Sequence, residues 1–249
     1  MKNDRGETMK RQNVRQLLIL VFFLLFPVVF YYLSPYLIIA SSLERTLAGD
    51  TITFFVLFLS GLVLGRLFCG WICPAGGLQE MCFPIRRSPV NQKYNWTKYL
   101  FWIPWMGLVL GIILTKGFYT KVDFLYQTEH GISLGTSSGL VPYITYYGVI
   151  LLFLVLTLTT GRRGFCHYGC WVSPFMIMGR WIGNTLHLPR LQLKARKETC
   201  TSCKVCNQKC PMSLDVNQMV QKEKMENLEC ILCGTCIDSC PQKVIRYKF

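Results

Sequence analysis

The sequence predicts two units: an all-α membrane domain of four transmembrane helices in two repeated hairpins, followed by a small α+β domain rich in cysteine. Of the 249 residues, 51% are hydrophobic and 16% are charged, whereas soluble domains average about 25% charged residues. Eight of the 13 cysteines fall between Cys200 and Cys240. Secreted disulfide scaffolds are also rich in cysteine, but they rarely contain several long apolar segments. We therefore interpret these cysteines as metal ligands.

Four segments are long and apolar enough to cross a bilayer, which takes roughly 20 mostly apolar residues each. They are residues 17–40, 51–73 and 99–115, and a stretch around 146–160 that ends at Gly161. The first is too long for the apolar part of a signal peptide, which covers about 7–15 residues, so we expect a retained span. Arg66, inside the second segment, is expected to snorkel to the interface near the helix end.

The distribution of Lys and Arg predicts the orientation. Five precede the first span, five lie from Arg66 to Lys98, and Arg162 and Arg163 follow the fourth span, whereas the other two loops hold only three. The positive-inside rule then places both termini on the cytoplasmic side of the inner membrane. We expect a basic N-terminus (1–16), a four-helix membrane domain (17–170), an interfacial amphipathic connector (171–195) and the cysteine-rich domain (196–249).

The C-terminal cysteines repeat one spacing. The stretches "CTSCKVCNQKCP" and "CILCGTCIDSCP" both read C-x-x-C-x-x-C-x-x-x-C-P, the spacing of bacterial ferredoxins in which the fourth cysteine ligates the other cluster. Zinc knuckles, the alternative, often include histidine, and none follows His187. The spacing therefore predicts two [4Fe-4S] clusters, one held by Cys200, Cys203, Cys206 and Cys240, the other by Cys230, Cys233, Cys236 and Cys210.

The membrane domain contains a second repeat. "GRLFCGWICP" follows the second span and "GRRGFCHYGC" follows the fourth. If these segments are helical, the spacing of four places Cys69 with Cys73, and Cys166 with Cys170, on one helix face. Four thiols that converge in this way predict a further metal site, for an iron–sulfur cluster or zinc. Buried free thiols and a redox dithiol stay open as alternatives, and Cys82, which has no counterpart, is interpreted as structural.

Other cofactors and partners are not indicated. No histidine lies within a span and no C-x-x-C-H occurs, so we expect no haem. No nucleotide-binding motif is found, and no nucleic-acid partner is expected. His167 is expected to make an ordinary hydrogen bond. From Arg190 onward, eleven Lys or Arg face six Asp or Glu, which suits membrane lipid or an acidic partner protein, or only solvates the loops.

The chain resembles the NapH-like family of polytopic membrane polyferredoxins, on the basis of "CGWICP" and the eight C-terminal cysteines. One departure is "CHYGCW", where Pro174 comes three residues late. The resemblance implies electron transfer between a quinone pool, or a ferredoxin-level donor, and a partner redox protein. We expect an electron-transfer subunit of quinol-dehydrogenase type, with no catalytic residue assigned. The alternative is an accessory iron–sulfur protein for redox sensing or metal-centre assembly.

Overall fold

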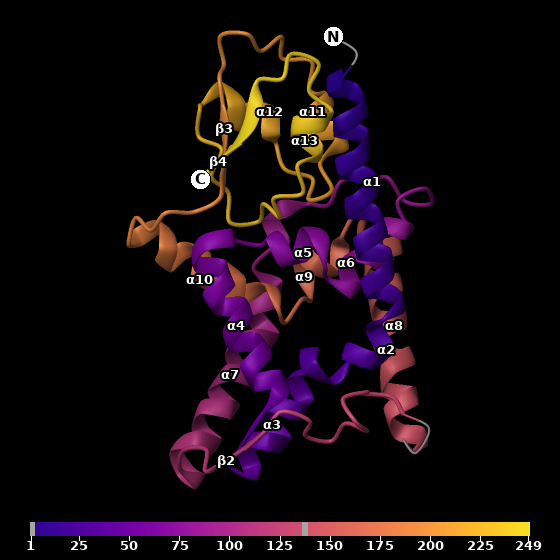
Figure 1. Cartoon of the computed structure of the whole chain (residues 1–249), viewed down its shortest axis with the longest axis vertical. Coiled ribbons are helices and arrows are strands. Elements are labelled where there is room, and N and C mark those ends of the chain that lie inside the picture. Colours follow the sequence, from indigo (N-terminus) through magenta and orange to yellow (C-terminus); the bar gives the residue numbers. More distant parts are fainter. Residues whose placement is uncertain (1–2, 136–138) are drawn as a thin grey trace.

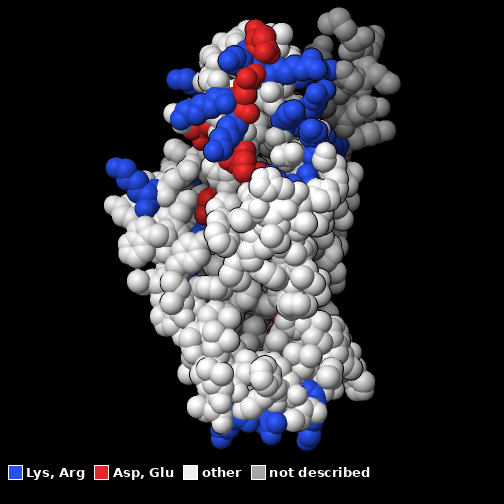
Figure 2. Space-filling view, turned by 90° about the vertical axis from the view of Figure 1, so that its left-hand side faces the viewer, with Lys and Arg blue, Asp and Glu red and all other residues white. Residues whose placement is uncertain are grey.

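The computed structural model describes residues 3–135 and 139–249, and within the first helix it describes side chains only from Arg11 onward. Residues 1–2 of the expected basic N-terminus lie outside this part. The molecule is elongated, with a body of helices at one end and the cysteine-rich domain at the other (Figure 1). On the face shown in Figure 2, charged side chains gather at the two ends, and the broad band between them is nearly free of charge.

The N-terminal segment is a broken helix. One unbroken helix across residues 17–40, as expected for a span, does not form, because this stretch is divided among four pieces. They are α1 (Asn3–Leu24), α2 (Phe26–Val29), the 3-10 helix η1 (Tyr31–Leu33) and α3 (Pro35–Leu43). Pro27 and Pro35 each stand in the first turn of a new helix, where the missing N–H costs nothing. Further inside a helix, a proline would remove a backbone hydrogen bond, so the two prolines divide the apolar run.

The first repeated hairpin unit contains α4 (Gly49–Leu64), α5 (Leu67–Trp71) and α6 (Pro74–Met81). The helix α4 ends at Gly65, whose φ of 56° is accessible to glycine without a steric penalty. Arg66 then turns into the protein and is 1% exposed. The expectation that Arg66 snorkels to the interface is therefore wrong.

The second unit repeats this order with α8 (Leu140–Thr160), α9 (Gly164–Tyr168) and α10 (Ser173–Thr185). Its long helix also ends at a glycine, Gly161, with φ of 117°. Between the units lie η2 (Gln92–Tyr94) and α7 (Thr97–Lys116). Among the described residues, the segments Gln92–Lys116 and Leu140–Thr160 are long and apolar enough to cross a membrane, and α4 is apolar but shorter.

The helical body also contains a short two-stranded β-sheet. Strand β1 (Thr46–Ala48) pairs in parallel with β2 (Lys121–Asp123) at the end far from the cysteine-rich domain.

The cysteine-rich domain has the expected α+β character. Its strands β3 (Gln192–Ala195) and β4 (Ile245–Lys248) pair antiparallel, Gln192 opposite Lys248. Its helices are α11 (Val205–Lys209), α12 (Val216–Gln221) and α13 (Thr235–Asp238).

Glycine allows α10, the helix of the expected connector, to pack closely against α4. Gly179 and Gly183 form a G-x-x-x-G pair on α10, and a Cβ atom on either would overlap a backbone carbonyl of α4. Gly61 of α4 faces the backbone of Met176 in the same way. Small residues at such spacing let two helix backbones approach each other. This contact anchors α10, which carries the chain to the C-terminal domain.

Substitution Gly179→Val tests this packing. A valine side chain would meet the carbonyl of Phe58, and overpacking of this kind costs about 1–3 kcal/mol, so we expect a lower midpoint of thermal unfolding in detergent. Gly107→Val in α7 is the matched control, because a Cβ there meets nothing within 4 Å. Equal unfolding midpoints for the two variants would contradict the role given to the glycine contact.

Candidate functional site

The eight cysteines of the C-terminal domain line two separate cavities, four to each. The first cavity is lined by Cys200, Cys203, Cys206 and Cys240. The second is lined by Cys230, Cys233, Cys236 and Cys210. Each fourth cysteine follows a short helix, α11 or α13, which leads the chain from its own cavity to the other. The structure thus brings together the two groups of four that crossed ligation requires, and ligation itself stays a prediction.

The backbone of both cysteine loops is curled at the same two positions. Ser202 and Leu232, directly before the second cysteine of each motif, have φ of 52° and 49°. Lys204 and Gly234, directly after it, have φ of 55° and 73°. The left-handed conformation costs a non-glycine residue roughly 1–2 kcal/mol, so it persists where the surroundings require it. A curled loop with its thiols around one cavity fits a cubane cluster bound by four thiolates.

Burial disfavours the ionisation of two thiols of the second cavity, Cys230 and Cys210. It raises the pKa of Cys230 to about 12 and that of Cys210 to about 11. Metal ligation requires thiolates, so ionisation at neutral pH depends on the positive charge that a bound metal centre supplies.

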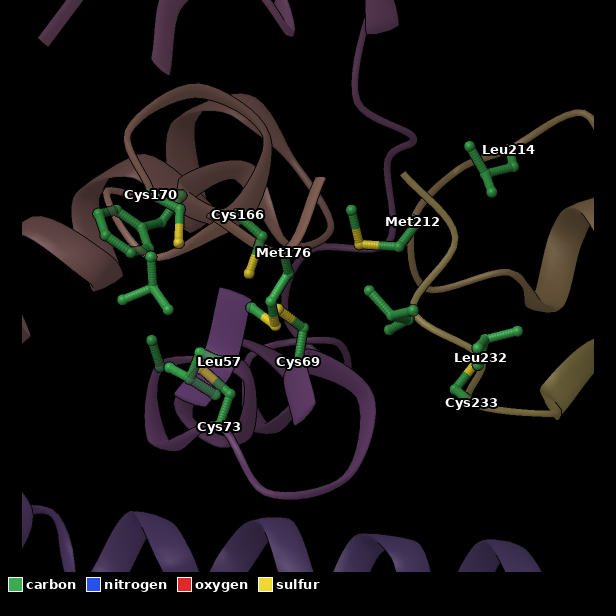
Figure 3. Close-up of a cluster of buried hydrophobic side chains, with 14 of the residues drawn as sticks. Leu57, Cys69, Cys73, Cys166, Cys170, Met176, Met212, Leu214, Leu232 and Cys233 are labelled. Carbon is green, nitrogen blue, oxygen red and sulfur yellow. The ribbon is translucent and has the colours of Figure 1, made fainter. Parts of the chain in front are cut away.

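The four cysteines of the C-x-x-x-C motifs also come together, beneath the C-terminal domain. Cys69 lies in α5 and Cys166 in α9, while Cys73 and Cys170 follow in the turns after them. All four are 7% exposed or less, and Figure 3 shows their sulfurs around a common space. Neither motif is a single helix, because α5 ends at Trp71 and α9 at Tyr168, and a turn brings the second cysteine back.

The ionisation of Cys73 reflects this proximity. Burial raises its pKa well above the ordinary thiol value, and the neighbouring Cys69, Cys166 and Cys170 raise it further. Within residues 3–135 and 139–249, no group of three or more His, Cys, Asp or Glu side chains is drawn together tightly enough for one metal ion. This holds for all three sets of four cysteines: each set surrounds a space, and none is drawn in to the distances of a single metal ion.

Hydrogen bonds between the two repeats fix the four thiols. The Gln79 carbonyl oxygen on α6 accepts from the backbone N–H groups of Phe165 and Cys166, at 3.1 and 3.4 Å. Its amide nitrogen lies 3.2 Å from the Cys166 sulfur. In the reverse direction, Arg163 donates to the carbonyl oxygen of Cys69 at 2.6 Å. Gln79 and Arg163 are fully buried, so each repeat supplies a side chain that holds the other.

Buried charges surround the same four thiols. Glu80 pairs with Arg163 at 2.5 Å and with Arg15 at 2.8 Å. Glu229 pairs with Arg66 and with Lys98. Burial alone would raise the pKa of both carboxyl groups, but the paired cations offset it and leave each pKa below its ordinary value.

The positive charges in these ion pairs outnumber the negative charges. The four cations are each 3% exposed or less, and only two carboxylates face them. Among the described residues around the C-x-x-x-C thiols, this leaves an excess of two positive charges. Unpaired buried charge is strongly unfavourable, so the site is suited to a group that carries negative charge.

The loop between the C-x-x-x-C cysteines touches the loop of the second C-terminal cavity. Gly70 lies so close to Ile231 that a Cβ atom would overlap the Ile231 carbonyl oxygen. Next to it, the Trp71 indole donates to the carbonyl oxygen of Leu232 at 3.2 Å. The loop of Cys69 and the loop of Cys233 are therefore in direct backbone contact.

Sequence reasoning missed most of the residues that support these sites. Arg66 and Arg163 both stand three residues before the first cysteine of a motif, and this shared position in the repeat was the available signal. No pattern pointed to Gln79 or Glu80. His167 makes the expected ordinary hydrogen bond, 2.8 Å from its Nδ1 to Asn95 Oδ1. Cys82 is buried and belongs to none of the three cysteine sets.

Two family models match the chain. One described as "4Fe-4S binding domain" matches residues 49–90 and 143–189, which include both C-x-x-x-C motifs. One described as "4Fe-4S dicluster domain" matches residues 199–245, which include all eight C-terminal cysteines.

Similar proteins occur in archaea and bacteria. An uncharacterized protein of Methanocaldococcus jannaschii is 28% identical over 205 residues, 78% of this chain and 76% of the relative. The protein YccM of Escherichia coli is 24% identical over 215 residues, 83% of this chain and 57% of the relative. The ferredoxin-type protein NapH of Haemophilus influenzae is 24% identical over 229 residues, 87% of this chain and 75% of the relative. No solved structure matches.

Substitution Cys210→Ser tests the crossed arrangement. Because Cys210 lines the cavity of Cys230, Cys233 and Cys236, we expect the EPR signal of that cluster to be lost or altered. The signal of the cluster beside Cys240 should persist. Cys82→Ser is the control and should leave both signals unchanged. Loss confined to the cluster of Cys200, Cys203 and Cys206 would show that ligation is not crossed.

Proposed function

Because this chain belongs to the NapH-like family of ferredoxin-type proteins, we propose that it is a membrane-bound iron–sulfur electron-transfer protein. In this proposal two [4Fe-4S] clusters occupy the cavities of the C-terminal domain, with the crossed ligand sets given above. The cavities and the curled loops support these positions. When bound, such clusters supply one-electron chemistry.

A third cluster at Cys69, Cys73, Cys166 and Cys170 completes the proposal. An oxidised [4Fe-4S] cluster with four thiolates carries about two negative charges, which would balance the two excess positive charges around these cysteines. Four neutral thiols would leave that charge unbalanced, which speaks against free thiols. Four-thiolate zinc has the same charge, but the 4Fe-4S description of the family model that matches both motifs favours the cluster.

The contact of Gly70 with Ile231 is the observation that supports electron transfer from one centre to the next, which we call the relay. Electron transfer slows steeply with distance, and this contact joins the loop of the proposed third centre to the loop of the second C-terminal cavity. The first cavity includes the exposed Cys203, which suits exchange with a soluble partner. Electrons would pass between the first cavity, the second cavity and the third centre, in either direction.

We also propose that the helical body lies in the membrane. The long apolar helices α7 and α8, the shorter α4 and the broken segment from α1 to α3 would occupy the bilayer, with both termini in the cytoplasm. The uncharged band in Figure 2 supports this arrangement. The third centre then lies at the cytoplasmic boundary, where quinone or a partner redox protein would exchange electrons with it.

An accessory role in redox sensing or metal-centre assembly is the second candidate. It does not require fast electron exchange, whereas the relay does. Anaerobic stopped-flow spectroscopy with a quinol analogue and with a soluble low-potential donor separates the two. Clusters that neither reagent reduces or oxidises rapidly would favour the accessory role.

The iron content tests the third centre. We expect about twelve iron atoms per chain in anaerobically purified protein, from about four in each [4Fe-4S] cluster. Changing all four C-x-x-x-C cysteines to Ser should lower the count by about four. Cys170→Ser alone should alter one EPR signal and serves if the quadruple variant does not fold. About eight iron atoms in both the unchanged protein and the variant would refute a cluster there.

The relay contact is tested by Gly70→Val. The added side chain must push the Ile231 loop away, so we expect unchanged iron content and at least a several-fold slower electron transfer between the second cluster and the third centre. Gly148→Val in α8, where a Cβ meets nothing within 4 Å, is the control. The measurement is freeze-quench EPR after reduction, and transfer at the unchanged rate would contradict the proposed route.

A further inference from the structure

The four buried cations beside the C-x-x-x-C thiols differ in how their donor groups are used. All three guanidinium nitrogens of Arg15, and all three of Arg163, donate to oxygen atoms of side chains or of the backbone. Lys98 has a single nitrogen, which donates to the Glu229 carboxylate. Arg66 binds the same carboxylate through Nη1, whereas its Nε and Nη2 donate to no oxygen atom of the described residues. The Arg66 side chain is 0% exposed, so surface water does not reach these two nitrogens.

The unused donors of Arg66 lie next to the thiols. Arg66 follows Gly65, where α4 ends, and stands three residues before Cys69. Burial raises the pKa of the Cys69 thiol, and Arg66 opposes this both as a positive charge and as a hydrogen-bond donor. Cys166 and Cys170, from the other repeat, are also electrostatic neighbours of Arg66. One guanidinium therefore acts on three of the four thiols of the proposed third centre.

The charges beside the second C-terminal cavity have opposite signs. The Glu226 carboxylate is a charged neighbour of Cys230, and the Arg162 guanidinium is one of Cys210. Three of the four cysteines of this cavity are 7 to 8% exposed, and the C-x-x-x-C cysteines are 2 to 7% exposed. Burial is thus similar at the two centres, and the difference between them lies in the charge around the thiols.

Reduction adds one negative charge to a cluster. Positive charge nearby, and N–H groups that donate to the ligand sulfurs, stabilise the added charge and raise the reduction potential. At the third centre the Gln79 amide nitrogen lies 3.2 Å from the Cys166 sulfur, and the Ser173 N–H donates to the Cys170 sulfur at 3.4 Å. Arg66 adds a full positive charge to these neutral donors. Its effect is strong because the effective dielectric constant of a buried site is far below that of water.

We infer that Arg66 sets the reduction potential of the third centre above that of the second cluster. This inference rests on the proposed function, because it requires a cluster at each centre. The reduced second cluster loses one electron, and the third centre takes up the same electron. No proton moves with it, because a guanidinium stays protonated. At equilibrium the electron therefore resides at the third centre, and flow from the C-terminal domain toward the helical body is downhill.

A purely structural role for Arg66 is the alternative. In that role its guanidinium only holds Glu229, and with it the C-terminal domain, at the end of α4. One donor is sufficient for this pair, since Lys98 binds the other oxygen of the same carboxylate. The substitution Arg66→Lys keeps a cation for Glu229 but removes the two further donors of the guanidinium, because lysine is a point charge. The two roles therefore predict different results for this variant.

A redox titration followed by EPR tests the inference. The variants Cys170→Ser and Cys210→Ser assign the signals of the third centre and of the second cluster. In the unchanged protein, we expect the third centre to be reduced at the higher potential. Arg66→Lys should make it at least tenfold harder to reduce, a fall of about 59 mV in midpoint potential for a one-electron couple. Arg180→Lys is the matched control and should leave this potential unchanged, because all three nitrogens of Arg180 donate to oxygen atoms.

The outcomes separate this inference from the proposed function. A third centre that titrates at or below the potential of the second cluster in the unchanged protein would overturn the inference, and this result requires no variant to fold. An unchanged midpoint potential in Arg66→Lys, at full iron content, would overturn it as well. In both cases the three clusters and the relay would stand. About eight iron atoms per chain and no third EPR signal would instead refute the third centre itself, and the inference with it.

Discussion

Glu80 and Glu229 each pair with two cations from distant parts of the chain, and the arrangement of the two repeats, α1 and the C-terminal domain depends on these four ion pairs. Glu80 joins α6 to α1 and to the start of α9, through Arg15 and Arg163. Glu229 joins the C-terminal domain to the end of α4 and to α7, through Arg66 and Lys98. Removing one partner of a buried pair costs about 3–5 kcal/mol. The pairs therefore fix the repeats, the first helix and the C-terminal domain around the same four thiols.

The sequence predicted the grouping of the C-terminal cysteines better than the path of the helices. The spacing of the C-terminal motifs was sufficient to group Cys240 with Cys200 and Cys210 with Cys230, because that spacing is a property of short loops. The apolar run at 17–40 predicted one helix, but Pro27 and Pro35 divide it. Arg66 was expected in water at the end of a span. Its carboxylate partner, Glu229, lies 163 positions away, a separation at which local patterns carry no information.

The repeat explains why the proposed third centre needs both units. Each unit contributes a long helix, a glycine that ends it, a buried arginine and two cysteines. Neither unit alone gathers four thiols, and cross-repeat contacts of Gln79 and Arg163 hold the halves in register. The departure at Pro174 has a small structural effect, because α10 still begins close behind Cys170 and places its proline in the first turn.

The first helix is bound by almost the last residues of the chain. Arg11 and Gln12 of α1 bind the Asp238 carboxylate, and Gln12 also reaches the Cys233 carbonyl oxygen. Arg11 and Asp238 are 227 positions apart, and at about 5–20 residues per second the ribosome needs roughly 10–45 s to make that length. Throughout this time Arg11 and Gln12 lack their partner Asp238, although Arg15 of the same helix can already pair with Glu80. The start of α1 therefore joins the C-terminal domain only after the first C-terminal cysteine motif and most of the second have been made.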